Sequence, residues 1–238
     1  MGKAKHSYLN FPVSMIPPIY LEKDIVTPMD NIISYGIALF VRENKTTKKE
    51  AGEKLGIHIG STLEQLMGVY DKYHEVAKVM TSIDKNKAFS LRDAQKSYKD
   101  NKDEIMALCG ELAVRSIVGV KEYAKCYRSL VLSRMAGFAK VIEESNYPEA
   151  IKRLSGDGGK RQWRKLIGSL RFAGCSVYAP DGCHGFYASF RLSPLELAEK
   201  VERKRMSGRA GTEYETEYDL SNEELRKRAL EKINNRTP

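Results

Sequence analysis

The sequence contains no hydrophobic run long enough to cross a membrane. Its longest apolar stretch, residues 32–41, is about half of the roughly 20 residues that a membrane helix needs. The N-terminal region also lacks a secretory signal, because Lys3 and Lys5 are followed by residues 8–12, Tyr-Leu-Asn-Phe-Pro, with neither a continuous apolar stretch nor a small-residue cleavage site. We therefore expect no membrane partner and a cytoplasmic location.

Cysteine is scarce, and its spacing excludes two common uses of the residue. The four cysteines lie far apart and form no CxxC pair, so the pattern indicates neither a zinc site nor the disulfide framework of a small secreted domain. We expect reduced thiols at all four positions. The cysteines are Cys109, Cys126, Cys175 and Cys183.

The sequence also lacks the motifs that usually carry catalysis. Its four histidines stand in dissimilar contexts, without a motif that would pair one of them with a nucleophile. Residues 156–160, Gly-Asp-Gly-Gly-Lys, resemble a phosphate loop only superficially, because they lack the GxxxxGK[ST] spacing and a clear preceding strand. His74 lies at the apolar edge of a predicted helix and is interpreted as a core histidine. We expect no enzymatic activity, no metal and no cofactor.

Acidic residues are too few to balance the basic ones. The 40 Lys and Arg residues exceed the 31 Asp and Glu residues, which leaves a formal net charge of +9 and a pI near 9.2. Residues 160–209 hold eleven basic and four acidic residues, a net of +7, so the rest of the chain carries only +2. This local excess favours a polyanionic partner such as nucleic acid, with a solvated basic face as the alternative.

Helix starts are marked where Ser or Thr is followed three residues later by an acidic residue, a pattern that satisfies the free amides of a helix N-terminus. Such pairs predict helices that begin at Thr27 and run to about Glu43, begin at Ser61 and run to about Met80, and begin at Ser90. The sequence therefore predicts that residues 1–102 are helical throughout.

Residues 103–192 show a mixed pattern of helices and short strands. The 22 residues between Gly137 and Lys160 are too many for a simple turn and require an inserted helix near 139–154. The order of helix, strand, helix, helix and hairpin is that of a winged helix-turn-helix. The predicted elements are a helix at 103–120, a strand at 122–126, helices at 129–137 and 160–173, and a β-hairpin at 175–192.

The fold class that follows is mainly α, with three parts. Residues 1–102 form a helical interaction domain, residues 103–192 a winged-helix domain with a small β-hairpin wing, and residues 193–238 a charged helical tail. Within the tail we expect a helix from Ser193 to about Arg205, a loop over residues 207–219 and a final helix that begins at Ser221.

The helix predicted at 160–173 carries the residue types that read DNA. Its apolar side packs inward, and Trp163, which could stack on a base, shares the register of that side and is interpreted as core. Arg and Gln can each make two hydrogen bonds to a base edge, whereas other basic residues are placed for phosphates. The predicted nucleic-acid-binding residues are Lys160, Arg161, Gln162, Arg164, Lys165, Ser169, Arg171, His184 and Arg191. Of these, Arg161, Gln162, Lys165 and Ser169 are expected to face outward, and Arg171, His184 and Arg191 are expected to contact phosphates.

Three runs of sequence carry a resemblance to a protein family. They are Leu112-Ala113-Val114-Arg115-Ser116-Ile117-Val118-Gly119, Leu132-Ser133-Arg134-Met135-Ala136-Gly137 and Gly182-Cys183-His184-Gly185-Phe186-Tyr187. These runs resemble an uncharacterised family encoded on bacterial mobile elements and phages, which is similar to winged-helix replication initiators and regulators. The resemblance extends from about Tyr8 to the hairpin, implies DNA binding, and supplies no catalytic residues.

The sequence therefore predicts specific binding of double-stranded DNA by a winged helix, in a replication initiator or transcriptional regulator of a mobile element. The N-terminal helices would form a homodimer or bind a replication or transcription protein. The alternative is a non-catalytic protein-interaction or RNA-binding module that uses the basic segment 160–209. Residues 47–66 are a second candidate for a helix-turn-helix. Gly56 follows Ala51 by five positions, however, where the motif has four, and this spacing favours an ordinary helical hairpin.

Overall fold

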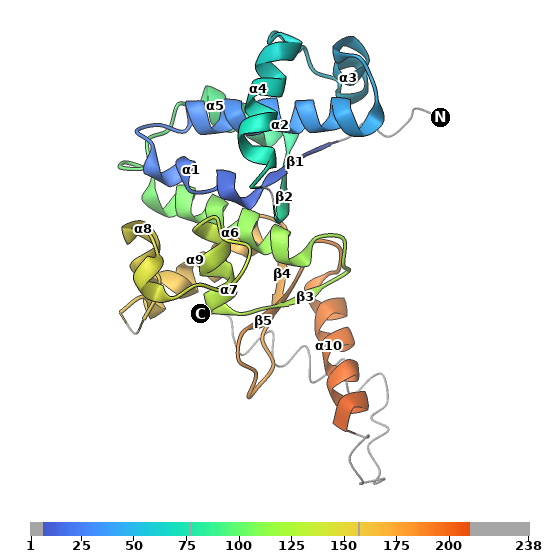
Figure 1. Ribbon diagram of the computed structural model, residues 1–238. Helices are drawn as coiled ribbons and strands as arrows, with labels where there is room; N and C mark the ends of the chain where they lie inside the picture. The colour runs from blue at the N-terminus through green and yellow to red at the C-terminus, as the bar shows by residue number, and fades with distance from the viewer. Residues whose placement is uncertain (1–6, 77, 157, 210–238) are drawn as a thin grey trace.

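The computed structural model describes residues 7–76, 78–156 and 158–209, and helices make up most of this part of the chain (Figure 1). The predicted fold class, mainly α with a small β-hairpin, is confirmed. Within the same residues, no helix combines the length and the apolar character needed to cross a membrane.

A two-stranded antiparallel sheet lies in the first half of the chain, where the sequence predicted helices alone. Strand β1 (Tyr8–Pro12) pairs with β2 (Met80–Asp84), and Leu9 lies opposite Ile83. Both of these residues are buried, whereas Tyr8 and Asn10 alternate with them on the exposed side. The all-helical prediction was wrong because each strand is only five residues long and its partner lies far along the chain.

Helices occupy the predicted regions of this half, but all three predicted starts are wrong. No helix begins at Ser90, which lies near the end of α5, a helix that Asp84 caps. Helix α2 begins at Val26 without a side-chain cap, so Thr27 lies inside it. Helix α4 is capped by Thr62 rather than Ser61, and it ends at His74 because Met80 already belongs to β2. The helical segments are η1 (Val13–Met15), α1 (Pro18–Leu21), α2 (Val26–Asn44), α3 (Lys48–Leu55), α4 (Leu63–His74) and α5 (Lys85–Asp93).

His74 is exposed, which corrects its interpretation as a core histidine. Its ring stacks on Tyr70 with centroids 4.3 Å apart, and its Nδ1 lies 3.1 Å from the hydroxyl of the fully buried Tyr35. Burial raises the pKa of Tyr35 to about 12, so this hydroxyl stays protonated at neutral pH. His74 therefore covers the edge of the core that α2 and α4 share.

The connection between α3 and α4 bears on the possible second helix-turn-helix. Gly56 ends α3 with a φ of 65°, and a Cβ on Gly52 would lie 2.9 Å from the carbonyl oxygen of Ile57, so Gly52 rather than Ala51 is the residue that packs against the turn. The two glycines are four positions apart, as in a helix-turn-helix. The connection runs over residues 56–62, however, which is longer than the three or four residues typical of that motif.

The second half of the described chain follows the predicted order of elements. The predicted helix near 139–154 is largely absent, since Pro148, which lacks an amide N–H, separates two short helical segments. The three-stranded sheet has the order β3-β5-β4 with both pairs antiparallel. The elements are α6 (Lys102–Val118), β3 (Ala124–Cys126), α7 (Arg128–Met135), η2 (Glu144–Asn146), α8 (Glu149–Lys152), α9 (Lys160–Phe172), β4 (Ser176–Tyr178), β5 (Phe186–Ser189) and α10 (Pro194–Arg209).

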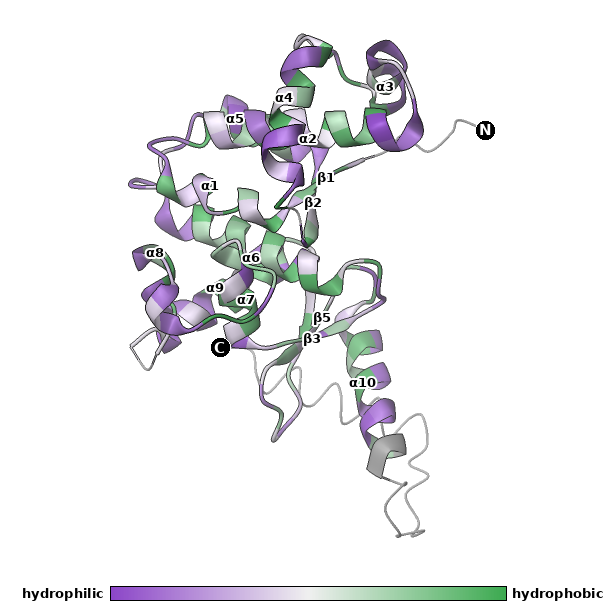
Figure 2. Ribbon diagram, viewed as in Figure 1, coloured by the Kyte–Doolittle hydropathy of each residue, from purple (hydrophilic) through white to green (hydrophobic). Residues whose placement is uncertain are grey.

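Helix α6 lies at the centre of the molecule, between the two halves (Figure 1). Its Leu112 is fully buried and its carbonyl accepts a hydrogen bond from the hydroxyl of Thr81 on β2, while its Gly110 lies against Leu166 of α9. The hydropathy colouring shows apolar residues concentrated on α6 and polar ones on the outer helices such as α3 and α8 (Figure 2). One hydrophobic cluster thus runs through both halves, across the predicted domain boundary at residue 102.

Helix α10 packs on the sheet through a smaller apolar cluster, in which Leu197, Ala198 and Val201 meet Tyr178 of β4. Ser193 and Glu196 form the predicted reciprocal cap at its start, and the Tyr178 hydroxyl donates to the carboxylate of Glu202. The predicted tail helix is therefore confirmed and reaches Arg209. The loop and the final helix predicted beyond it lie outside the described residues.

Candidate nucleic-acid interface

Helix α9 presents a basic surface because its apolar residues recur on one side only. Leu166 and Leu170 are buried, and Trp163 and Ile167 are half-buried beside them. Leu166 touches α6 where Gly110 leaves room, since a Cβ on that glycine would lie 2.8 Å from Leu166 Cδ1. This close crossing holds α9 against the core and turns its other side toward solvent.

The structure brings most of the predicted binding residues together on α9. Ser169 does not face outward as predicted: it is half-buried, and its hydroxyl donates to the carbonyl of Leu166 in its own helix. Gln162 is exposed but lies toward α6 and α8, where it lines a groove with Tyr98. The exposed predicted residues of α9 are Lys160, Arg161, Gln162, Arg164, Lys165 and Arg171.

The two predicted residues of the hairpin region lie apart from each other. His184 is exposed in the loop between β4 and β5. Arg191 follows β5 and is also exposed, but it lines a different groove, which Arg115 and the β1–β2 sheet share. Arg191 therefore does not join α9 in one continuous pocket.

A groove separates α9 from the hairpin, and we call it the arginine groove. It has a volume of about 440 Å³. Trp163 and Phe186 contact each other in its lining, with ring centroids 6.2 Å apart and planes inclined by 56°. Its lining residues are Arg128, Trp163, Arg164, Ile167, Gly168, Arg171, Ala179, Gly185 and Phe186.

Arg128 is a groove residue that the sequence analysis missed. Its guanidinium donates to the carbonyl oxygens of Leu154 and Gly156, which lie in the segment that leads to α9, and it lies 5.7 Å from the centre of the Trp163 ring. It therefore ties the start of α7 to the chain before α9 and adds a positive charge beside the tryptophan. Nothing in the local sequence around the start of α7 signals these contacts.

The positive charge along the groove is not neutralised within the described residues. In that part of the chain, no carboxylate forms an ion pair with Arg161, Arg164 or Arg171. Lys165 lies 3.7 Å from the exposed carboxylate of Asp103, a distance at which two solvated groups interact weakly. The exposed side of α9 therefore keeps its charge available for an anion.

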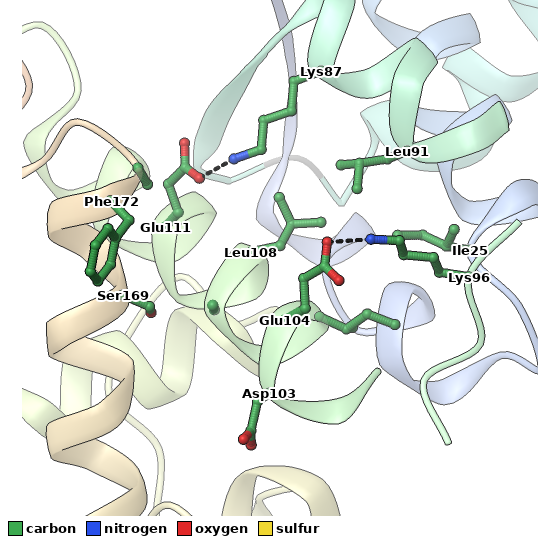
Figure 3. Close-up of a pocket in the computed structure, with 13 residues that line it drawn as sticks. Ile25, Lys87, Leu91, Lys96, Asp103, Glu104, Leu108, Glu111, Ser169 and Phe172 are labelled. Carbon is green, nitrogen blue, oxygen red and sulfur yellow. Dashed lines mark hydrogen bonds and ion pairs between the residues drawn. The ribbon is translucent and has the colours of Figure 1, made fainter. Parts of the chain in front are cut away.

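A second groove, between α5, α6 and α9, differs in its electrostatics (Figure 3). Its volume is about 400 Å³, and its two lysines are each paired with a carboxylate of α6, Lys87 with Glu111 and Lys96 with Glu104. Phe172, at the end of α9, projects beside it and is 95% exposed. Because its cations are neutralised, this groove lacks the anion-binding character of the arginine groove.

Three of the four cysteines, Cys109, Cys126 and Cys175, are buried, whereas Cys183 is partly exposed. All four are free, and burial raises the pKa of Cys126 and of Cys175 to about 12. These two thiols stay protonated at neutral pH, so they are poor nucleophiles. Among the described residues, no group of three or more His, Cys, Asp or Glu side chains is arranged to hold a metal ion.

Comparison with known proteins adds no further assignment. No family model, characterised protein or solved structure matches this chain significantly.

Proposed function

We propose that this chain binds double-stranded DNA through a winged helix formed by residues 103–192, with α9 in the major groove. The elements follow the order α6, β3, α7, α9, β4 and β5, and the hairpin of β4 and β5 pairs with β3 to complete a three-stranded sheet. In a winged helix-turn-helix the third helix enters the major groove and the hairpin lies along the backbone.

The observation that carries the proposal is the charge on α9. Arg161, Arg164 and Arg171 are exposed, and within the described residues they form no ion pair, while the opposite side of the same helix packs on α6. Unpaired guanidinium groups on a helix held rigidly by the core suit both phosphate contacts and bidentate bonds to guanine. In this proposal Arg161, which lines none of the grooves described above, reads base edges, and Arg191 contacts phosphates.

The biological role that fits this activity is that of a replication initiator or transcriptional regulator of a mobile element. Residues 1–102 would then serve as the interaction region. Its partner would be a second copy of the chain or a protein of the replication or transcription machinery.

The test is a comparison of one selected duplex with random duplexes of equal length. Selection from a random library supplies the preferred sequence, and fluorescence anisotropy measures both affinities at low salt. We expect Arg161→Gln to weaken binding to the selected duplex by about 1–3 kcal/mol, more than binding to random duplexes. Arg191→Gln should weaken both equally.

Arg42→Gln is the matched control, because Arg42 is an exposed arginine on α2, next to Asp71 and far from α9 in the chain. It should leave both affinities unchanged. An absence of duplex binding at low salt would overturn the proposal. Binding to RNA or to an acidic protein in its place would support the alternative, a non-catalytic interaction module that uses residues 160–209.

A further inference from the structure

The arginine groove contains an aromatic surface that binding to a paired duplex does not need. Phosphates require only the cations of Arg164 and Arg171, yet the groove between them is lined by the apolar side chains of Trp163, Ile167 and Phe186. Trp163 packs against the core on one side but is only partly buried, and it lines the groove, so part of its ring is available there. A groove with an apolar, aromatic floor and a cationic rim is complementary to a ligand that joins a flat ring to an anion.

The volume and the charge of the arginine groove limit the kinds of ligand that it can bind. A volume of about 440 Å³ lies within the range of small-ligand sites, roughly 300–1,000 Å³. The rim holds two arginines without ion-pair partners in the described residues, and Arg128 adds a third cation that its carbonyl contacts keep in place. An uncharged aromatic ligand would make no ion pair with these cations, and a bare phosphate would not contact the aromatic floor of the groove.

We propose that the arginine groove holds one unpaired nucleotide of the bound DNA. Its base would stack on Trp163, and its phosphate would bind Arg164 and Arg171. Stacking on aromatic side chains together with cationic backbone contacts is the general way in which proteins hold unpaired bases. This inference rests on the proposed function, because the DNA strand that lies along the hairpin would bring the nucleotide to the groove.

A groove that holds an unpaired nucleotide favours DNA in which one base is already free. In a fully paired duplex every base is stacked inside the helix, so filling the groove requires a base to be unpaired first. A duplex with one bulged nucleotide supplies such a base without that cost. The protein should therefore prefer a bulged duplex to a paired duplex of the same sequence by about tenfold, a typical value for stacking one base on an aromatic ring.

The chain carries its own reporter, because Trp163 is the only tryptophan in its 238 residues. We expect a bulged duplex to quench the fluorescence of Trp163 strongly and the paired duplex to quench it little. Deoxyadenosine monophosphate at millimolar concentration should also quench it, whereas inorganic phosphate, which has no base, should not. The mononucleotide measurement examines the groove alone and does not depend on duplex binding.

Variants separate the groove from the outer face of α9. Trp163→Phe keeps an aromatic ring against Phe186, so the protein should fold, and the smaller ring should reduce the bulge preference to about threefold or less in an anisotropy assay. Arg171→Gln should reduce the same preference. Arg161→Gln should lower the affinities for bulged and paired duplexes by the same factor, and Phe172→Ala, at an exposed aromatic outside the groove, should change neither.

Two results would overturn the inference about the groove. One is fluorescence of Trp163 that neither the bulged duplex nor the mononucleotide changes. The other is a bulge preference that Trp163→Phe and Arg171→Gln leave intact. Failure of the proposed function looks different: the protein would bind no duplex at low salt, while quenching by the mononucleotide would still support the groove.

Discussion

Two glycines in the loop between β4 and β5 show how single residues shape the hairpin beside the groove. Gly185 has a φ of 94° and Gly182 a φ of 67°, so both adopt the left-handed region that other residues rarely occupy. They differ in their surroundings. A Cβ on Gly185 would collide with the carbonyl oxygen of Cys126 on β3, whereas no atom lies within 4 Å of a Cβ on Gly182. Gly185 thus allows the hairpin to approach β3 closely.

We predict that Gly185→Ala lowers the free energy of unfolding by about 2–4 kcal/mol, because it adds a collision with backbone to the cost of a positive φ. Gly182→Ala should lower the free energy of unfolding by only about 1 kcal/mol, because it brings the cost of a positive φ without a collision. Urea denaturation of the two variants measures the difference. Equal losses would show that the contact with Cys126 does not constrain the hairpin.

At the scale of elements, one buried carboxylate joins α5 to α6. Glu111 on α6 pairs with Lys87 of α5 and, 3.0 Å away, with Arg115 of its own helix, and only 6% of its side chain is exposed. Arg115 in turn lies over the ring of Phe190, so the network reaches the end of β5. Glu104, on the same helix, pairs with Lys96, but 54% of its side chain is exposed.

This contrast predicts different effects for the same substitution at two positions. Glu111→Gln should lower the free energy of unfolding by about 2–4 kcal/mol, because it leaves a largely buried arginine without its counter-charge. Glu104→Gln should change it by less than about 0.5 kcal/mol, as expected for a solvated pair. In thermal denaturation at neutral pH, Glu111→Gln should lower Tm strongly and Glu104→Gln should lower it negligibly. A similar decrease for both variants would contradict the role of burial.

At the scale of the whole molecule, charge is distributed unevenly around the main hydrophobic cluster. Residues 160–209 hold seven of the nine net positive charges, and the arginines that α9 contributes are exposed on the helix whose Leu166 and Leu170 are buried. Residues 1–102, which are twice as many, carry a net charge of only +4 and contribute apolar contacts to the same cluster. The molecule therefore directs one strongly basic surface toward solvent.

We predict that the affinity for duplex DNA falls steeply with salt, because each neutralised phosphate releases condensed counterions. If about four to six phosphates are contacted, the logarithm of the binding constant should decrease with the logarithm of salt concentration with a slope of about −4 to −5. Anisotropy titrations across a salt series measure this slope. A slope near zero would mean that the basic surface does not contact the phosphates.

The sequence was sufficient for those features that depend on neighbouring residues. The apolar spacing that produces α9, the alternation that produces the hairpin and the cap at Ser193 are all local, and each is present in the structure. Local signals also misled in places. Ser61 and Thr62 are both followed three residues later by Glu or Gln, and in the structure Thr62 and Gln65 form the reciprocal cap, while Pro148 interrupts the predicted inserted helix.

The sequence by itself determined the helical character of the chain, the order of elements over residues 103–192 and the concentration of positive charge, because these follow from local spacing and composition. Only the tertiary structure decided that β1 pairs with β2, that Ser169 faces inward and that Arg128 joins Trp163 at the arginine groove. These features depend on contacts between segments far apart in the chain. Such contacts are selected by the packing of the whole core, which no local pattern encodes.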